Sequence, residues 1–297
     1  MSQARANRRG IVAILAATAC FTTNDAAVKL VARTTPVGEV LFVRGLIACL
    51  LVGSVLAALG RVANLRLALN QLVLARSGLE ALAALFFTSA LIHMPLAELS
   101  TVVLVSPLII TALSVVLFGE IVGWRRWSAI TVGFIGTLFV VKPTPSTFDA
   151  WALLGLLCAL TSASRDLLTR RLRRGIPSII VSFMSAVSVT LAGALLGLWE
   201  AWRILIWSEI GLLALSAVFL AAGNYLVVLA FREGEISAVS PFRYSLLVWA
   251  GIAGYLVFGE LPDHWAFCGA LLIVGSGIYA LHRETIRRRE SAQPSEV

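Results

Sequence analysis

The sequence predicts an all-α integral membrane protein with ten transmembrane helices, arranged as two inverted five-helix repeats. Three observations predict this fold. Hydrophobic residues make up 59% of the 297 residues and charged residues only 13%, which is too apolar for a soluble globule of this length. Ten apolar segments have the length that a helix needs to cross the hydrocarbon. The triplet Phe118-Gly119-Glu120 returns as Phe258-Gly259-Glu260, in surroundings of opposite charge.

The ten expected spans are separated by turn and charge signals. In order, they cover roughly residues 11–32, 37–60, 68–92, 95–118, 125–142, 150–170, 177–199, 209–231, 236–258 and 264–282. The basic residues between them set the orientation, because Lys and Arg concentrate in cytoplasmic loops. With the N-terminus inside, sixteen basic residues are cytoplasmic and only Arg33, Lys142 and Arg203 are outside. We therefore expect both termini to be cytoplasmic.

The first span follows three arginines in residues 1–9, which imitates a signal peptide. Its apolar run continues for about 20 residues without a small-residue cleavage site, so we expect the span to be retained. Tryptophans support the span boundaries, since seven of the eight lie at or just beyond predicted span ends. Only Trp249 lies in mid-span. The cysteines lie inside apolar runs without metal or redox spacing, which favours a packing role.

The second half of the sequence repeats the first after a shift of 140 or 141 positions. Asp25 then aligns with Asp166, and the turn proline Pro36 aligns with Pro177. Because five spans is an odd number, the second copy enters the membrane from the opposite side. The charges agree, since two arginines follow the first Phe-Gly-Glu triplet closely whereas acidic groups follow the second. We predict repeats at residues 1–145 and 146–285, followed by a cytoplasmic tail at 286–297.

The same pattern resembles a known family. It comprises two inverted five-span halves, the motif Asn24-Asp25-Ala26-Ala27-Val28-Lys29, then Pro36 and Arg44, and a Phe-Gly-Glu triplet that closes the fourth span of each half. These features resemble the drug/metabolite transporter superfamily, in particular its bacterial EamA-type members, over nearly the whole chain. The resemblance implies secondary transport across the bacterial inner membrane, often export of amino acids, including aromatic ones, or related metabolites. Other members take up S-adenosylmethionine, riboflavin or nucleobases.

Charged residues inside the spans are candidates for substrate binding, since each needs a partner, a wet cavity or a route to the interface. Asp25 and Lys29 lie one helical turn apart and can form a pair. Arg44 has Asp25 as its expected partner. These three residues either tie the first two helices together or recognise substrate charge. With Asp25 and Lys29, Thr18, Phe21 and Thr22 form a stripe that should face the protein interior.

The third span carries a second pair, Arg76 and Glu80. Structural pairing is favoured for it, but Glu80 lies deep enough to bind a substrate amine or carry a proton. In the sixth span, Arg165 takes the position of Asn24, and Asp166 takes that of Asp25. We assign both mostly to the cytoplasmic interface. Lys29 and Arg44 are replaced in the second half by Arg170 and Ser185, which argues against two equivalent sites.

Arg243 is the best single binding candidate, although it can also snorkel to the interface. It follows Ser240-Pro241, and a proline within a span frees backbone carbonyls at a depth where transporter sites commonly form. Additional contacts to a substrate are expected from Asn224, Tyr225, Tyr244 and Trp249. Pro107 and Pro241 are the expected hinges. For Glu120 and Glu260 we favour a structural role, with the glycine forming a turn and the glutamate capping the next helix.

These residues favour a carrier over an enzyme or a channel. His93, His264 and His282 lie near span ends and form no catalytic or metal cluster, so no enzymatic activity, metal or cofactor is expected. No filter-like loop is visible. We predict a monomeric secondary transporter that exports amino acids or related metabolites by alternating access. The alternative is uptake of a nucleotide-like metabolite, such as S-adenosylmethionine, a nucleobase or riboflavin.

The expected partners are the small-molecule substrate and the lipid bilayer. The net charge of +8 is scattered through short connectors, so nucleic acid is not expected. Asp25 or Glu80 could carry a coupling proton, and the sequence leaves the coupling ion open.

Overall fold

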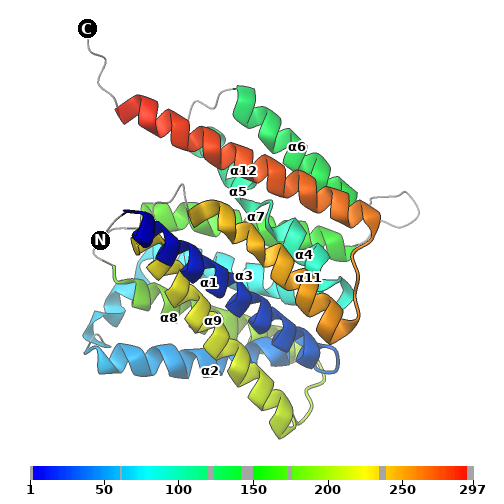
Figure 1. Cartoon of the computed structure of the whole chain (residues 1–297). Helices are drawn as coiled ribbons and strands as arrows, with labels where there is room; N and C mark the ends of the chain where they lie inside the picture. The colour runs from blue at the N-terminus through cyan, green and yellow to red at the C-terminus, as the bar shows by residue number, and fades with distance from the viewer. Residues whose placement is uncertain are drawn as a thin grey trace.

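The computed structural model describes residues 3–60, 62–118, 124–141, 150–172, 176–233 and 239–292, which contain no strand. The first half comprises α1 (Gln3–Ala32), α2 (Val37–Ala58), the 3₁₀ helix η1 (Val62–Leu69), α3 (Gln71–His93), α4 (Leu96–Val103), α5 (Ser106–Phe118) and α6 (Trp124–Val141). The second half comprises α7 (Ala150–Arg171), α8 (Ser178–Leu196), η2 (Gly197–Trp199), α9 (Trp207–Glu233), η3 (Ser240–Tyr244), α11 (Ser245–Phe258) and α12 (His264–Ala292), as Figure 1 shows.

The helices confirm the ten predicted spans. Eight helical segments are long and apolar enough to cross a membrane, and two shorter apolar helices, Trp127–Val141 and His264–Ala280, complete the set. The fourth and ninth spans are each built from two pieces, α4 with α5 and η3 with α11. Helix α12 continues into the predicted tail as far as Ala292. The predicted repeat boundary at residue 145 lies outside the described residues.

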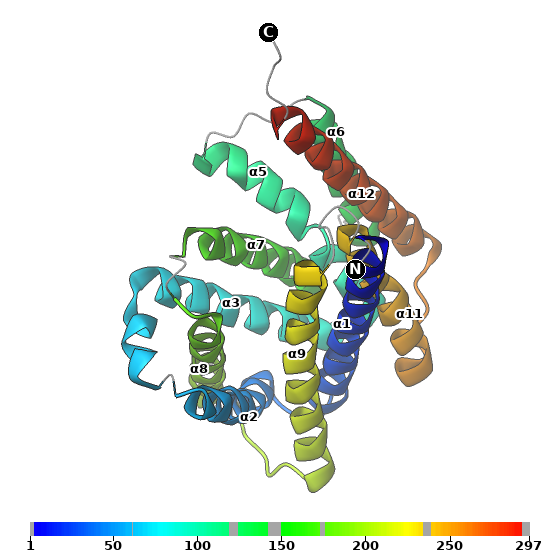
Figure 2. The ribbon, with the colours of Figure 1, turned by 60° about the vertical axis from the view of Figure 1, so that its left-hand side comes forward.

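The contacts between helices follow a pseudo-twofold relation between the halves. Helix α1 packs extensively on α9, and its counterpart α7 packs in the same way on α3, the counterpart of α9. Helices α2 and α8 are counterparts that pack on each other, as do α6 and α12. Figure 2 shows these pairs side by side. Because exchanging the halves reproduces each major contact, the fold is an inverted repeat. Pro36 and Pro177 directly precede α2 and α8, as their alignment predicts.

Glycines bring α2 and α8 into backbone contact. A Cβ atom on Gly193 would lie 2.6 Å from Phe42 N and 2.8 Å from Gly38 O. Within a membrane the hydrophobic effect does not drive helices together, because lipid is as apolar as the side chains. Close approach of the backbones strengthens van der Waals packing, which drives the association instead. Gly136 and Gly269 play the same part between α6 and α12, where added Cβ atoms would meet the opposite backbone.

The largest buried apolar cluster lies at one end of the molecule. It gathers the end of α1, the beginning of α2 and the turn from α3 to α4, with Val31, Val40, Leu91, Leu96 and Leu99 at its centre. Orientation by charge predicts that this end faces away from the cytoplasm.

Both predicted hinges coincide with interruptions of a helix. Helix α4 ends at Val103, and α5 begins at Ser106, with Pro107 in its first turn, where a missing N–H is tolerated. Ser106 Oγ donates to Val103 O at 2.6 Å and to Ala159 O at 3.2 Å. In the second half, Pro241 lies at the beginning of η3. These short irregular segments both border the cavity described next.

Candidate functional site

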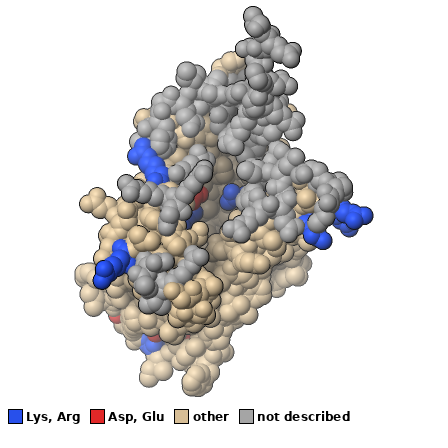
Figure 3. Space-filling view, turned by 90° about the vertical axis from the view of Figure 1, so that its left-hand side faces the viewer, with Lys and Arg blue, Asp and Glu red and all other residues tan. Residues whose placement is uncertain are grey.

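A cavity of about 490 Å³ lies between the two halves. Its walls come from α1, α2, α3, the α4–α5 break, α7, α9, η3, α11 and α12. Figure 3 views the face where α1 begins and α12 ends, and it shows a hollow with acidic and basic atoms at its bottom. This face is the one predicted to be cytoplasmic. The cavity thus combines depth, polarity and an opening on one side.

The cavity is lined by pairs of residues that occupy corresponding positions in the two repeats. It therefore lies on the pseudo-twofold axis. The numbers within each pair differ by the same 140 or 141 positions that align the two halves. The pairs are Phe21 and Ser162, Asn24 and Arg165, Asp25 and Asp166, Glu80 and Leu220, Val103 and Arg243, Leu104 and Tyr244, and Ser106 and Leu246.

Two repeat-related pairs, Asn24 with Asp25 and Arg165 with Asp166, line the cavity. Asn24 Nδ2 donates to Asp25 Oδ1 at 2.8 Å, and Arg165 Nε donates to Asp166 Oδ1 at 3.0 Å. In each half, the residue before the aspartate is thus a hydrogen-bond donor to the carboxylate. The donor is a neutral amide in the first half and a guanidinium in the second. The cavity is therefore symmetric in shape but asymmetric in charge.

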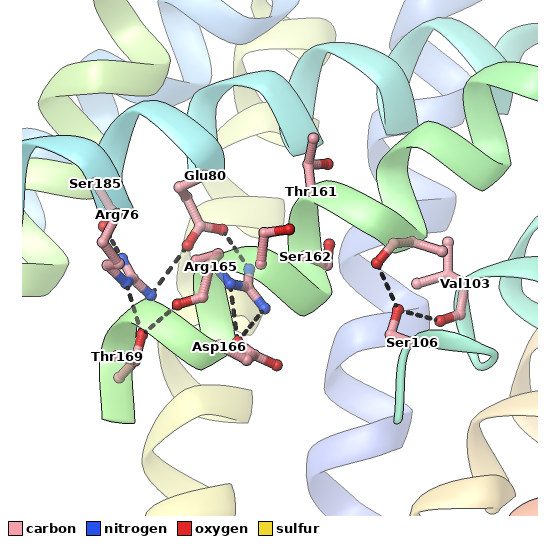
Figure 4. Close-up of polar contacts among 12 residues, drawn as sticks. Arg76, Glu80, Val103, Ser106, Thr161, Ser162, Arg165, Asp166, Thr169 and Ser185 are labelled. Carbon is pink, nitrogen blue, oxygen red and sulfur yellow. Dashed lines mark hydrogen bonds and ion pairs between the residues drawn. The ribbon is translucent and has the colours of Figure 1, made fainter. Parts of the chain in front are cut away.

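A charge network joins α3 to α7 on one wall, as Figure 4 shows. Arg165 Nη1 lies 2.9 Å from Glu80 Oε1, and Arg76 Nη2 lies 3.1 Å from Glu80 Oε2, so two guanidinium groups share one carboxylate. Arg76 also donates to Ser185 Oγ and to Thr169 Oγ1. The predicted pair of Arg76 and Glu80 is confirmed.

The assignment of Arg165 and Asp166 to the membrane interface was wrong, because both line the cavity. Distance from the end of a helix gives the depth of a residue but not the face on which it lies. Here Arg165 lies on the face of α7 that packs on α3, so its side chain reaches Glu80 rather than the headgroups. The alignment of Asp25 with Asp166 was the sequence signal that could have identified this pair.

Arg44 and Asp25 meet the expectation that they would interact. Both line the cavity, and the guanidinium interacts electrostatically with the carboxylates of Asp25 and Glu80. Within the described part of the chain, Arg44 forms no hydrogen bond and no ion pair. Arg243 and Tyr244 also line the cavity, and Tyr244 is buried.

The predicted pair of Asp25 and Lys29 does not form. Lys29 is buried, and its Nζ donates to Glu260 Oε1 and to Met94 O, both at 2.7 Å. Although Lys29 follows Asp25 by one turn, its long side chain reaches the Glu260 carboxylate in the α11–α12 turn and the Met94 carbonyl in the α3–α4 turn, and both solvate the ammonium. The stripe itself is confirmed as inward-facing, since Thr18, Thr22 and Lys29 are buried and Phe21 and Asp25 line the cavity.

Glu260 does not cap the helix that follows it. Its Oε2 accepts from Leu96 N at 3.0 Å, at the beginning of α4 in the other half, whereas Asp263 Oδ1 accepts from Ala266 N at the beginning of α12. Gly259 adopts a φ of +68°, which confirms the expected turn. Glu120 lies outside the described residues.

Three other predicted residues, Asn224, Tyr225 and Trp249, do not line the cavity. Asn224 and Tyr225 are exposed on α9, and Asn224 Nδ2 donates to Leu220 O in its own helix. Leu220, one helical turn before Asn224, is the described α9 residue that lines the cavity. Trp249 Nε1 is buried without a partner among the described residues. The side chain of Ser240 is outside what the structure describes. No three described His, Cys, Asp or Glu residues form a metal-binding group.

Inverted repeats of transmembrane helices around a polar cavity on the repeat axis are the architecture of many secondary transporters. The EamA-like transporter family matches residues 8–142 and 149–281. The chain belongs to this family, and it is a multi-pass membrane protein.

Characterised relatives differ in what they transport and in direction. The chain is 29% identical to the pseudopaline exporter CntI of Pseudomonas aeruginosa, over 90% of this chain and 94% of that protein. It is 29% identical to a riboflavin transporter of Rhizobium johnstonii, over 75% and 72% of the two chains. It is 30% identical to an S-adenosylmethionine uptake transporter of Rickettsia prowazekii, over 67% and 69%. A protein of known crystal structure shares the fold, with a TM-score of 0.62 and 21% identity over 94% of this chain and 98% of its own.

Proposed function

We propose that the protein exports amino acids or related small zwitterionic metabolites across the bacterial inner membrane by alternating access. The observation that carries this proposal is a cavity lined both by a carboxylate and by a guanidinium that forms no hydrogen bond or ion pair with any described residue. Asp25 offers a carboxylate to an ammonium group, and Arg44 offers a guanidinium to a carboxylate. A zwitterionic substrate would pair its ammonium group with Asp25 and its carboxylate with Arg44, in a site where unpaired charge is costly.

Export is supported by one relative in particular. Among the relatives named above, the exporter aligns over the largest share of both chains. The alternative function, uptake of a nucleotide-like metabolite, is favoured by the relatives that carry riboflavin and S-adenosylmethionine. These two functions differ in substrate chemistry, so a transport assay separates them.

Alternating access requires that one end of the cavity be closed while the other is open. At the end opposite the opening, a cluster that we name the outer lock comprises Lys29, Met94, Leu96 and Glu260. It joins α1 and the α3–α4 turn of one half to the α11–α12 turn of the other. We infer that the described conformation is inward-open and that breaking the outer lock accompanies opening to the other side.

The test is substrate counterflow in liposomes that contain the purified protein. Labelled amino acids, S-adenosylmethionine, riboflavin and nucleobases are compared with and without a pH gradient. We expect counterflow of amino acids, lost in the Asp25→Asn and Arg44→Gln variants and absent from empty liposomes. Dependence on the pH gradient would identify protons as the coupling ion. Counterflow of riboflavin or nucleobases alone would contradict the amino-acid proposal.

A further inference from the structure

We propose that Asn24 and Asp25 form a subsite for a primary ammonium group, in which the buried amide oxygen of Asn24 accepts a hydrogen bond from the substrate. The inference rests on the proposed function, because it names the chemistry by which the cavity recognises a zwitterion. Asn24 lines the cavity beside Asp25 but was not among the residues singled out in the sequence.

The amide of Asn24 has one satisfied end and one unsatisfied end. Asn24 is only 4% exposed, its Nδ2 donates to Asp25 Oδ1 at 2.8 Å, and its Oδ1 is buried without a hydrogen-bond partner in the described part of the chain. When Asp25 is ionised, as pairing with an ammonium group requires, its carboxylate only accepts hydrogen bonds, so it faces the NH₂ group and leaves Asn24 Oδ1 as an acceptor. A buried acceptor without a donor is destabilising, so this oxygen favours a ligand that brings a donor.

The ligand that fits two adjacent acceptors best is an ammonium group. The Asp25 carboxylate and the Asn24 oxygen present negative charge and lone pairs in neighbouring positions, and an ammonium group carries one positive charge and three donors. A hydroxyl group has one donor and no charge, so it would leave the carboxylate without a counterion.

The repeat-related position shows why this subsite exists only once. Asp166 already has a cationic donor in Arg165, whose Nη2 lies 2.9 Å from Asp166 Oδ1. A second cation there would meet the guanidinium. In the first half the corresponding donor is neutral, so among the described residues the charge of Asp25 is offset by Arg44, which forms no ion pair with it. The first repeat has Asn24 where the second has Arg165. This difference orients a zwitterion so that its ammonium group lies toward α1.

The test compares probes that differ by one charged group. They are L-phenylalanine, 3-phenylpropionate and phenethylamine, and the corresponding set L-leucine, 4-methylpentanoate and isoamylamine. Binding is measured by thermal shift or calorimetry with the full chain in nanodiscs. Asn24→Leu, which removes the acceptor and keeps the volume, should weaken both amine-containing probes about tenfold and change the carboxylates less than about twofold. Asn24→Ala should weaken the same probes. This second variant keeps the test valid if Asn24→Leu folds poorly.

The matched control is Thr23→Val. Thr23 is the neighbouring residue, does not line the cavity, and donates through Oγ1 to Ala19 O in its own helix at 2.9 Å. We expect wild-type binding of every probe. Equal weakening of all probes by Asn24→Leu, or unchanged preference for the amine, would overturn the subsite.

Failure of the proposed function is a separate outcome. If the wild type binds S-adenosylmethionine but neither amino acid, weaker binding of S-adenosylmethionine by Asn24→Leu supports the subsite while the amino-acid proposal fails. If the wild type binds riboflavin alone, which has no ammonium group, both proposals fail.

Discussion

Lys29 Nζ lies 2.7 Å from Glu260 Oε1, although 231 residues separate them in the chain. The side chains are 2% and 22% exposed, so this ion pair is largely withdrawn from solvent. The Lys29 ammonium also donates to Met94 O, and the Glu260 carboxylate accepts from Leu96 N. The pair connects the first helix of one repeat to the Phe-Gly-Glu turn of the other. Its stability should therefore influence which side of the cavity is open.

Glu260→Gln should open the outer lock. It removes the ion-pair partner of the buried Lys29 ammonium, and breaking a buried pair in this way costs about 3–5 kcal/mol. The measurement is labelling of Ser100→Cys, a cavity residue, by an impermeant thiol reagent added to intact cells, in a background without the native cysteines. We expect labelling several-fold faster than with Glu260 present.

Arg33→Gln is the control for this experiment. Arg33 lies 3.6 Å from the same carboxylate oxygen, but its side chain is 45% exposed and well solvated. In the Arg33→Gln variant, the labelling rate of Ser100→Cys should stay close to that of the parent. Equal rates for the Glu260→Gln variant and the parent would show that the pair does not hold the cavity closed.

Exchanging the two charges should not restore the outer lock. In the double variant Lys29→Glu with Glu260→Lys, the new lysine faces the Leu96 N–H at the beginning of α4, where the helix dipole favours negative charge. The new glutamate faces the Met94 carbonyl, which is also an acceptor. We expect Ser100→Cys to be labelled as fast as in Glu260→Gln. A return to the parental rate would mean that the ion pair alone determines closure.

Arg165→Lys should abolish most transport even though it preserves the charge. Arg165 uses Nη1 for Glu80 and both Nε and Nη2 for Asp166, and the single nitrogen of lysine cannot bridge two carboxylates in this way. We expect a counterflow rate at least about tenfold lower, with a smaller change in melting temperature. A variant that transports at the wild-type rate would show that the bridge between α3 and α7 is dispensable.

The sequence predicted the features that depend on length and periodicity. The ten spans, the helix breaks at Pro107 and Pro241 and the Arg76–Glu80 pair follow from local spacing, and the inverted repeat follows from the shift of 140 or 141 positions and the odd number of spans. Features that depend on neighbouring helices could not be predicted in the same way. Lys29 finds its partner on a distant turn, and Arg165 finds Glu80 across a helix contact. Local spacing identifies which side chains need partners, whereas helix packing decides which partners they find.

Gly193→Ala should destabilise the contact between α2 and α8. The added methyl group would lie 2.6 Å from Phe42 N, and backbone atoms cannot move aside as a side chain can. Overpacking of this kind costs about 1–3 kcal/mol, so the melting temperature in detergent should fall by several degrees. Gly211→Ala in α9 is the control, since nothing lies within 4 Å of the added methyl group. It should leave the melting temperature unchanged or raise it, because alanine favours the helix. Equal behaviour of the two variants would contradict close packing at Gly193.

The inverted repeat makes a final prediction about the two faces of the membrane. Leu59, at the end of α2, is predicted to be cytoplasmic and is 58% exposed, whereas Ile204, between η2 and α9, is predicted to be outside and is 94% exposed. In a background without native cysteines, an impermeant maleimide added to intact cells should label Ile204→Cys and not Leu59→Cys. Permeabilising the membrane should then label both, which shows that Leu59→Cys is reactive. Labelling of both in intact cells would place the two turns on one face. An odd number of spans between them would then be impossible, and the pseudo-twofold relation of the cavity would have to be abandoned.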